Sequence, residues 1–246
     1  MKTLLTLLLA CILSGAACIV QAGNGAAVEA QLAKQLGLRA GDVTASPVPG
    51  LYRITIGPQV AYVSTDGRYL IRGDIIDMRD GDNLTLSQRA QARLAYIKQL
   101  GPADMIVFAP PHTKHTITVL TDIDCEYCRM LEHDRPELNA MGIAVRYLFF
   151  PRDGAGSVSW QKAVAVWCAK DRKAAFEAAM RGEPVKSAKC NAAPVAAGYR
   201  FGQLLGIDGT PAIITDRGRL IDGYLPAPAL AYALNLPSRP ARHRSQ

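Results

Sequence analysis

An apolar, β-branched run leads directly into a C-x-x-C pair in TVLTDIDCEYC, residues 118–128. Such a run predicts a buried strand, and the pair then falls where a helix starts. The first backbone N–H groups of a helix have no helical partner, so Cys125 meets the positive end of the helix dipole. That environment favours the thiolate and lowers the pKa of Cys125 from its ordinary value of about 8.5. The junction therefore favours folds in which a strand delivers a reactive thiol to a helix N-terminus.

The other residues of this stretch define the expected active site. Cys128 lies less than one turn after Cys125, faces it, and can release a mixed disulfide formed there. A nucleophile has to be reached, so Cys125 is expected near the surface rather than sealed in the interior. The Glu126 carboxylate is expected to raise the pKa of Cys125, and the Arg129 charge to lower it. Tyr127 is the third residue expected to tune the site. The sequence alone does not show whether these effects together raise or lower the pKa of Cys125.

Three other interpretations compete with redox chemistry. A zinc site needs a second close pair, but Cys168 and Cys190 are far apart and no histidine lies at ligand spacing. A structural disulfide between Cys125 and Cys128 closes too short a loop to stabilise the chain much. The third interpretation is that the C-x-x-C spacing arose by chance. Cys168 lies inside a helical pattern, so nothing there activates it as a second redox thiol. We expect neither a metal nor a cofactor.

Residues 1–22 have the features of a secretory signal peptide. A basic start and an apolar stretch precede small residues, with Val20 and Ala22 at the −3 and −1 positions of a cleavage site. An uncleaved anchor is the alternative, but the apolar run is short for a membrane span. Lipidation at Cys18 is a third option, disfavoured by Gly15. Cleavage after Ala22 leaves an even number of cysteines in an exported chain, which favours disulfide chemistry.

Residues 23–84 predict one helix and a small antiparallel sheet. The segment AAVEAQLAKQLG has apolar side chains four apart and ends in a glycine stop. Strand-like runs follow, and Asp66-Gly67 between two of them predicts a hairpin turn. About sixty residues make a thin core, so this domain is expected to need a partner.

Residues 85–102 predict a linker helix, with Thr85 and Gln88 as a capping box. Residues 237–246 form a basic flexible tail. The formal net charge of the whole chain is +7, but outside the tail its basic residues are dispersed. No stripe of interleaved basic and aromatic residues occurs, so no nucleic-acid partner is expected.

Residues 103–236 predict an α/β domain with the order β-α-β, helices, β-β, helix. The near-continuous apolar run AVRYLFF is typical of a buried parallel strand. Residues 157–183 predict one helical stretch, and Pro136 is expected to end or kink the catalytic helix. Asp216 to Gly218 predict the turn of the last hairpin.

Several motifs in one order now bring a resemblance. The second half of the chain resembles the thioredoxin superfamily in four motifs: HTITVLTDIDCEYC, NAMGIAVRYLFFPR, VWCAKD leading to Cys190, and GIDGTPA. Together with the N-terminal segment YVSTDGRYLIRGDIIDM, these motifs resemble the DsbC/DsbG family of periplasmic disulfide isomerases. The fold class implied is α+β: an N-terminal helix-plus-sheet dimerisation domain, a linker helix, and a thioredoxin-like α/β domain with a helical insertion. The family usually has Gly-Tyr between the cysteines, where this chain has Glu126-Tyr127.

The resemblance also implies roles. Cys125 matches the nucleophile and Cys128 the resolving thiol, while Pro211 matches a cis-proline that, with Thr210, offers a bare backbone edge to substrate. Cys168 and Cys190 match a structural disulfide. The position of thioredoxin's buried acid falls at Val119. Asp122 and Asp124 share one strand face, where a solvated or capping role is favoured over proton shuttling.

The implied function is isomerisation of wrong disulfides in misfolded exported proteins, by a periplasmic homodimer that a membrane reductant of the DsbD type keeps reduced. Residues 73–78 are the candidates for pairing across the two-fold axis. Two alternatives stay open. One is a DsbG-like reductase of single oxidised cysteines, and the other is a dimeric holdase chaperone that binds unfolded chains.

Overall fold

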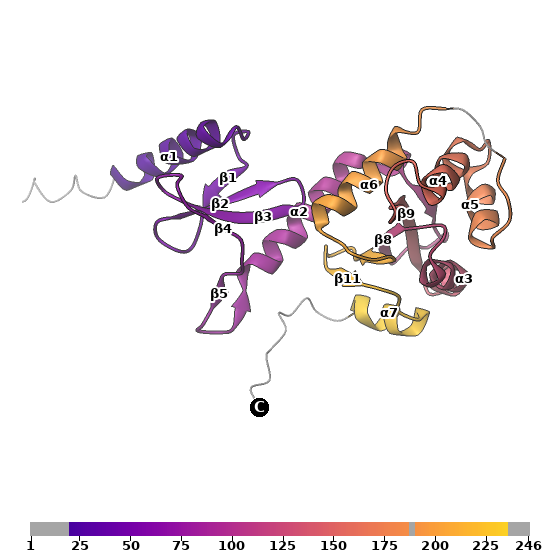
Figure 1. The fold of residues 1–246 in the computed structure, drawn as a ribbon. Helices are drawn as coiled ribbons and strands as arrows, with labels where there is room; N and C mark the ends of the chain where they lie inside the picture. The colour runs from indigo at the N-terminus through magenta and orange to yellow at the C-terminus, as the bar shows by residue number, and fades with distance from the viewer. Residues whose placement is uncertain (1–19, 187–189, 236–246) are drawn as a thin grey trace, which may run out of the picture. The chain divides into compact units, whose positions relative to one another are not determined.

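The computed structural model describes residues 20–186 and 190–235 (Figure 1). They form two compact units, one of residues up to Ile56 with Val60–Gly73, and one of Gly57–Gln59 with the chain from Asp74 on. Most of the predicted signal peptide and the whole predicted tail lie outside the described residues. No helix within the described ranges is both long and apolar enough to cross a membrane.

The first unit packs one helix on a small sheet. Helix α1 (Val20–Leu36) ends before Gly37, which has a φ of 67°, as the sequence predicts. The sheet has the order β1-β2-β3-β4, formed by β1 (Val43–Ala45), β2 (Leu51–Ile56), β3 (Gln59–Ser64) and β4 (Leu70–Ile71). The predicted turn at Gly67 joins β3 to β4, and its φ of 72° suits a glycine. The core is thin and consists of Leu32, Ala33, Val43, Ile54 and Val63.

A two-stranded hairpin and a long helix follow. Strand β5 (Ile76–Asp77) pairs with β6 (Asp82–Asn83), and helix α2 spans Leu84–Leu100. The predicted capping box is wrong. Asn83 is the N-cap and accepts a hydrogen bond from the Leu86 N–H, while the buried Thr85 hydroxyl accepts one from the Ile75 N–H. A side-chain amide oxygen on an extended residue is a good helix cap, which explains why Asn83 takes this place.

A short 3-10 turn, Pro102–Asp104, leads into a five-stranded sheet of order β11-β10-β8-β9-β7. Only β8 and β9 are parallel among its neighbouring pairs. The apolar run predicted to be a buried parallel strand is β9, which confirms that prediction. The strands are β7 (Ile106–Phe108), β8 (His115–Thr121), β9 (Ile143–Phe149), β10 (Ala212–Ile214) and β11 (Leu220–Asp222).

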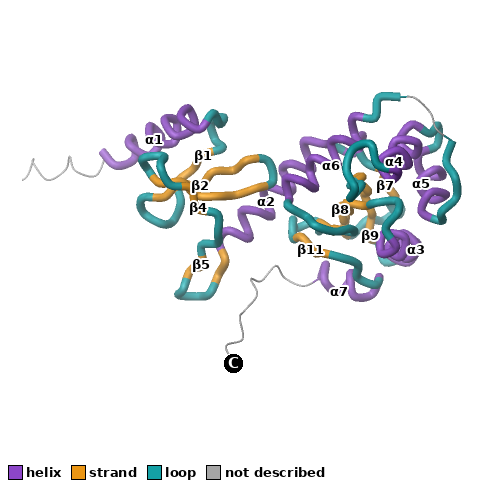
Figure 2. Tube along the Cα trace, in the orientation of Figure 1, coloured by secondary structure: helices purple, strands orange, loops and turns teal. Residues whose placement is uncertain are grey.

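Helices cover both faces of this sheet (Figures 1 and 2). Because side chains alternate along a strand, Leu120 and Leu148 face one side while Val119 and Tyr147 face the other. The first face packs against α2 and α6. The second packs against α3, α4, α5 and α7. The helices not yet bounded are α3 (Glu126–Ala140), α4 (Val158–Cys168), α5 (Arg172–Met180), α6 (Ala193–Leu205) and α7 (Ala227–Asn235).

The stretch 157–183 is helical, as predicted, and consists of two helices. Helix α4 ends at Cys168 and α5 starts anew, because the Asp171 carboxylate caps the N–H groups of Lys173 and Ala174. Helix α3 does not end at Pro136 but continues to Ala140.

Helix α6 crosses the sheet so closely that Gly198 leaves no room for a side chain. A Cβ at Gly198 would lie 2.6 Å from the carbonyl oxygen of Phe149 in β9. We expect Gly198→Ala to lower the free energy of unfolding by about 1–3 kcal/mol through overpacking. Gly209→Ala, which meets no atom within 4 Å, should change it by less than about 0.5 kcal/mol. Equal urea midpoints for the two variants would contradict the close helix–sheet contact.

Candidate active site

The predicted strand-to-helix junction is present. Strand β8 ends at Thr121, a short loop follows, and α3 begins at Glu126 with Cys125 as its N-cap residue. Cys125 has extended backbone angles (φ −92°, ψ 123°), and its carbonyl accepts the first helical hydrogen bond from Arg129 N–H at 3.1 Å. The sequence thus places Cys125 at the start of the helix, and Cys128 one turn further on the same inner side.

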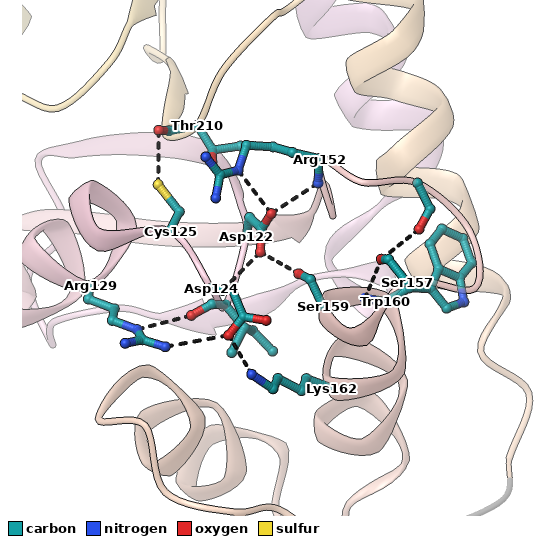
Figure 3. A network of polar contacts seen from close by, with 12 residues as sticks. Asp122, Asp124, Cys125, Arg129, Arg152, Ser157, Ser159, Trp160, Lys162 and Thr210 are labelled. Carbon is teal, nitrogen blue, oxygen red and sulfur yellow. Dashed lines mark hydrogen bonds and ion pairs between the residues drawn. The ribbon is translucent and has the colours of Figure 1, made fainter.

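A second segment reaches the thiols from the other edge of the sheet. Strand β10 pairs with β8, with Ala212 opposite Leu120, so the residues just before β10 lie beside the C-x-x-C pair. The Thr210–Pro211 peptide bond is cis. The Cys125 thiol donates a hydrogen bond to the Thr210 carbonyl oxygen at 3.2 Å (Figure 3). The structure therefore brings together Cys125, Cys128, Thr210 and Pro211. The two segments are about eighty residues apart in the sequence, so only the tertiary structure joins them.

The exposure of Cys125 departs from expectation. Only 3% of its surface is exposed, and only 1% of that of Cys128. Its neighbours Asp124 and Glu126 are both exposed, but Cys125 itself is buried and its thiol is directed at Thr210. The expectation of a thiol near the surface is therefore wrong.

The two thiols have very different acidities. The pKa of Cys125 is lowered to about 5, first because the Cys128 thiol hydrogen-bonds to its sulfur. Burial opposes this effect, while the Thr210 side chain, the Cys128 backbone N–H and the charge of Arg152 add to it. Burial raises the pKa of Cys128 far above its ordinary value, and its hydrogen bond to Cys125 raises it further. One thiolate is therefore stabilised at the expense of the other.

A buried carboxylate holds the loop before Cys125. Asp122 is 2% exposed and accepts hydrogen bonds from the backbone N–H and Nε of Arg152, both at 3.0 Å. It also accepts from the Asp124 N–H at 2.9 Å and from the Ser159 hydroxyl (Figure 3). Burial alone would raise the pKa of Asp122, but these hydrogen bonds together lower it. The expectation of a solvated Asp122 is wrong, and Asp122 does not cap α3, whose N-cap residue Cys125 has no side-chain cap hydrogen bond. Its bond to the Asp124 N–H lies within the loop between β8 and α3.

Asp124 forms the outer half of this network. Its carboxylate lies 2.5 Å from the Lys162 ammonium and 3.5 Å from the Arg129 guanidinium. Arg129 also donates through Nε to the Ile123 carbonyl at 3.1 Å, so its charge is directed at the loop. Glu126 and Tyr127 lie on the outer surface of the first helical turn, where 59% of Tyr127 is exposed.

The remaining cysteines lie away from the pair. A disulfide joins Cys168, at the end of α4, to Cys190, which precedes α6. Across residues 20–186 and 190–235, no group of three or more His, Cys, Asp or Glu side chains is arranged to hold a metal ion.

Three contributors to the site escaped the sequence reasoning: Arg152, Ser159 and Lys162. A signal for Arg152 was present. It follows β9, the parallel neighbour of β8, and the carboxyl ends of parallel strands meet at one edge of a sheet. Ser159 and Lys162 come from α4, whose placement over this edge depends on tertiary packing that no local pattern encodes.

Comparisons with known proteins agree along the chain. Residues 20–86 match the disulfide bond isomerase protein N-terminal domain, and residues 102–236 match a thioredoxin-like domain. The thiol:disulfide interchange protein DsbC of Salmonella typhimurium is 38% identical over 218 residues, 88% of each chain. That of Escherichia coli K12 is 37% identical over 82% of this chain and 84% of its own. A disulfide interchange protein structure from Neisseria gonorrhoeae is 29% identical over 55% of this chain and 95% of its own, with a TM-score of 0.49.

The thioredoxin-like domain and the paired thiols at its strand-to-helix junction define a thiol:disulfide interchange protein. Both domains match in family order, and the relatives are covered over most of their length. The chain belongs to the DsbC family.

The Asp122 network makes a pH-dependent prediction. Because the folded-state pKa of Asp122 is lowered, its contribution to stability is present above the unfolded-state pKa of about 3.9 and is lost as the pH falls through the folded-state value. We expect Asp122→Asn to lower the free energy of unfolding by about 1–3 kcal/mol at pH 7, and the difference to shrink below about pH 4. Asp124→Asn, with more exposed ion pairs, should cost less than about 1 kcal/mol. Urea unfolding measures both, and equal losses would contradict the structural role of Asp122.

Proposed function

We propose that the chain is a disulfide isomerase and reductase in which Cys125 is the nucleophile. The supporting observation is the acidity of this one thiol, with a pKa lowered to about 5 beside a Cys128 that stays protonated. At neutral pH the Cys125 thiolate attacks a substrate disulfide, one substrate sulfur bonds to Cys125, and the other leaves as a thiolate. The Asp122 network supports this role by fixing the loop that carries the nucleophile.

The mixed disulfide has two outcomes. A free thiolate of the substrate attacks its own sulfur on Cys125, which forms a new substrate disulfide and regenerates the enzyme thiolate. Otherwise Cys128 attacks Cys125 and leaves the enzyme oxidised. Continued isomerisation then needs a dithiol reductant, and we propose a membrane reductase of the DsbD type.

Thr210 and Pro211 are proposed to bind the substrate backbone. They lie beside the Cys125 sulfur just before the short strand β10. An extended substrate segment can hydrogen-bond to such a backbone edge as an added strand, which places its disulfide near the thiolate. The small exposed fraction of Cys125 supports selection for extended, locally unfolded segments over folded surfaces.

We further propose a periplasmic homodimer that acts on misfolded exported proteins. The match to the isomerase N-terminal domain supports dimerisation through the first part of the chain. Exposed apolar side chains there also suit pairing with a second copy; they are Tyr69, Leu70, Ile71, Ile76 and Met78. Residues 73–78 are proposed to contribute β5 to that interface. The disulfide between Cys168 and Cys190 suits an oxidising compartment.

The same apolar side chains favour a second candidate function, a holdase for unfolded chains, and a DsbG-like reductase of single oxidised cysteines is a third. Cys125→Ala separates these functions. We expect it to abolish the repair of a scrambled disulfide substrate while leaving protection of a cysteine-free aggregating protein unchanged. Cys128→Ala is the matched control and should accumulate mixed disulfides. Full repair by Cys125→Ala would contradict the proposal, and so would wild-type protein that reduces a sulfenic acid substrate but repairs no scrambled disulfide.

A further inference from the structure

A buried acid below the second thiol has no part in the mechanism described so far. Glu132 follows Cys128 by four residues on α3, so the two side chains lie on the same helix face with Cβ atoms about 5–6 Å apart. Only 8% of the Glu132 side chain is exposed. Tyr147 of β9 is 1% exposed and is the register partner of Val119, on the sheet face that α3 covers.

The polar atoms of this pair are incompletely satisfied. Glu132 Oε1 accepts a hydrogen bond from Arg135 Nε at 2.6 Å. Glu132 Oε2 and the Tyr147 hydroxyl are buried and make no hydrogen bond of standard geometry with any described residue. The Tyr147 phenol and Glu132 still act on each other as hydrogen-bonding neighbours, but their geometry leaves the buried carboxylate oxygen incompletely satisfied, which is costly.

The pKa of Glu132 is raised overall, and burial is the largest cause. Burial raises its pKa, while the neighbouring Tyr147 phenol and Arg135 lower it and Glu177 raises it. The pKa of Tyr147 is raised well above its ordinary value by burial and by the Glu132 charge, with a smaller effect from Cys128, so the phenol stays protonated. The phenol is thus close to both the carboxyl and the resolving thiol.

A route to solvent is present on the outer side. Glu132 lines a cavity of about 390 Å³. Other charged or titratable residues of its wall are Arg129, His133, Arg135, Glu177 and Arg181. The His133 and Arg181 side chains are largely exposed, so the rim of the cavity reaches water. A proton on Glu132 can therefore leave without crossing the apolar core.

We propose that Glu132 takes up the proton that Cys128 releases when it resolves a mixed disulfide. The proposal rests on the proposed function, because it concerns the second half of that reaction. In this step the Cys128 S–H bond breaks, its proton passes to the Glu132 carboxylate, and a Cys125–Cys128 bond forms. The bond between Cys125 and the substrate sulfur breaks, and the substrate leaves as a thiolate. The mixed disulfide itself supplies the oxidising equivalents.

The chemistry explains why an acceptor is needed. Cys128 is too weakly acidic to be a thiolate at neutral pH, so its proton must leave as its sulfur attacks. Glu132 and Cys128 are neighbours on one face of α3, a separation that one water molecule can bridge.

Two-phase kinetics with the reduced protein and an aromatic disulfide reagent test the proposal. Attack by Cys125 releases the first coloured aromatic thiolate, and resolution by Cys128 releases the second. We expect Glu132→Gln to leave the first phase unchanged and to slow the second about tenfold, at the low end for general base catalysis because water is a substitute. The second-phase rate should also lose its inflection with pH.

Two further variants exclude a purely structural effect. Glu177→Gln removes the other ion pair of Arg135, at 2.5 Å, and should leave the first phase unchanged. Because Glu177 raises the pKa of Glu132, this variant should move the second-phase inflection to lower pH. Tyr147→Phe removes a group that lowers the pKa of Glu132 and should move the second-phase inflection to higher pH. The proposal fails if Glu132→Gln keeps the second-phase rate and pH profile, if it slows both phases equally, or if Tyr147→Phe leaves the inflection in place. Loss of the first phase in wild-type protein would instead contradict the proposed function.

Discussion

A hydrogen bond between the two thiols of the C-x-x-C pair lowers the pKa of Cys125 and raises that of Cys128. Cys128 remains a thiol because it is buried, and as a thiol it can donate to the Cys125 sulfur. The Cys125 thiolate is stabilised by that bond more than by any nearby positive charge. Nucleophilic attack and resolution therefore have separate electrostatic requirements, although they occur less than one helical turn apart.

The surrounding fold maintains this arrangement at two points. The parallel pair β8 and β9 brings Arg152 to the loop before Cys125, where Asp122 binds it together with Ser159. Strand β10 brings Thr210 to the sulfur, and the Thr210 side chain helps to lower the pKa of Cys125. A buried carboxylate accepting several hydrogen bonds is rigid, and the loss of its partners would leave a desolvated charge, so the loop has little freedom to displace the nucleophile.

Local patterns were sufficient for much of the fold. The run before the pair predicts β8, AVRYLFF predicts β9, and the glycine turns predict the hairpins, because each signal lies within a few neighbouring residues. The missed features depend on distant contacts. The burial of Asp122 needs α4, and the neighbours of Glu132 include Tyr147 of β9. The nearly covered sulfur of Cys125 reflects a segment 85 residues away. Spacing gives the position of a thiol on a helix but not what lies over it.

Titration of the thiolate by its ultraviolet absorbance in the reduced wild-type protein, with Cys125→Ala as the blank, tests the central claim most directly. The account predicts one thiolate half-formed near pH 5 and a second that stays protonated through the neutral range. A Cys125 midpoint at about 8.5 or above, the ordinary range for a cysteine, would show that the pair does not activate its first thiol.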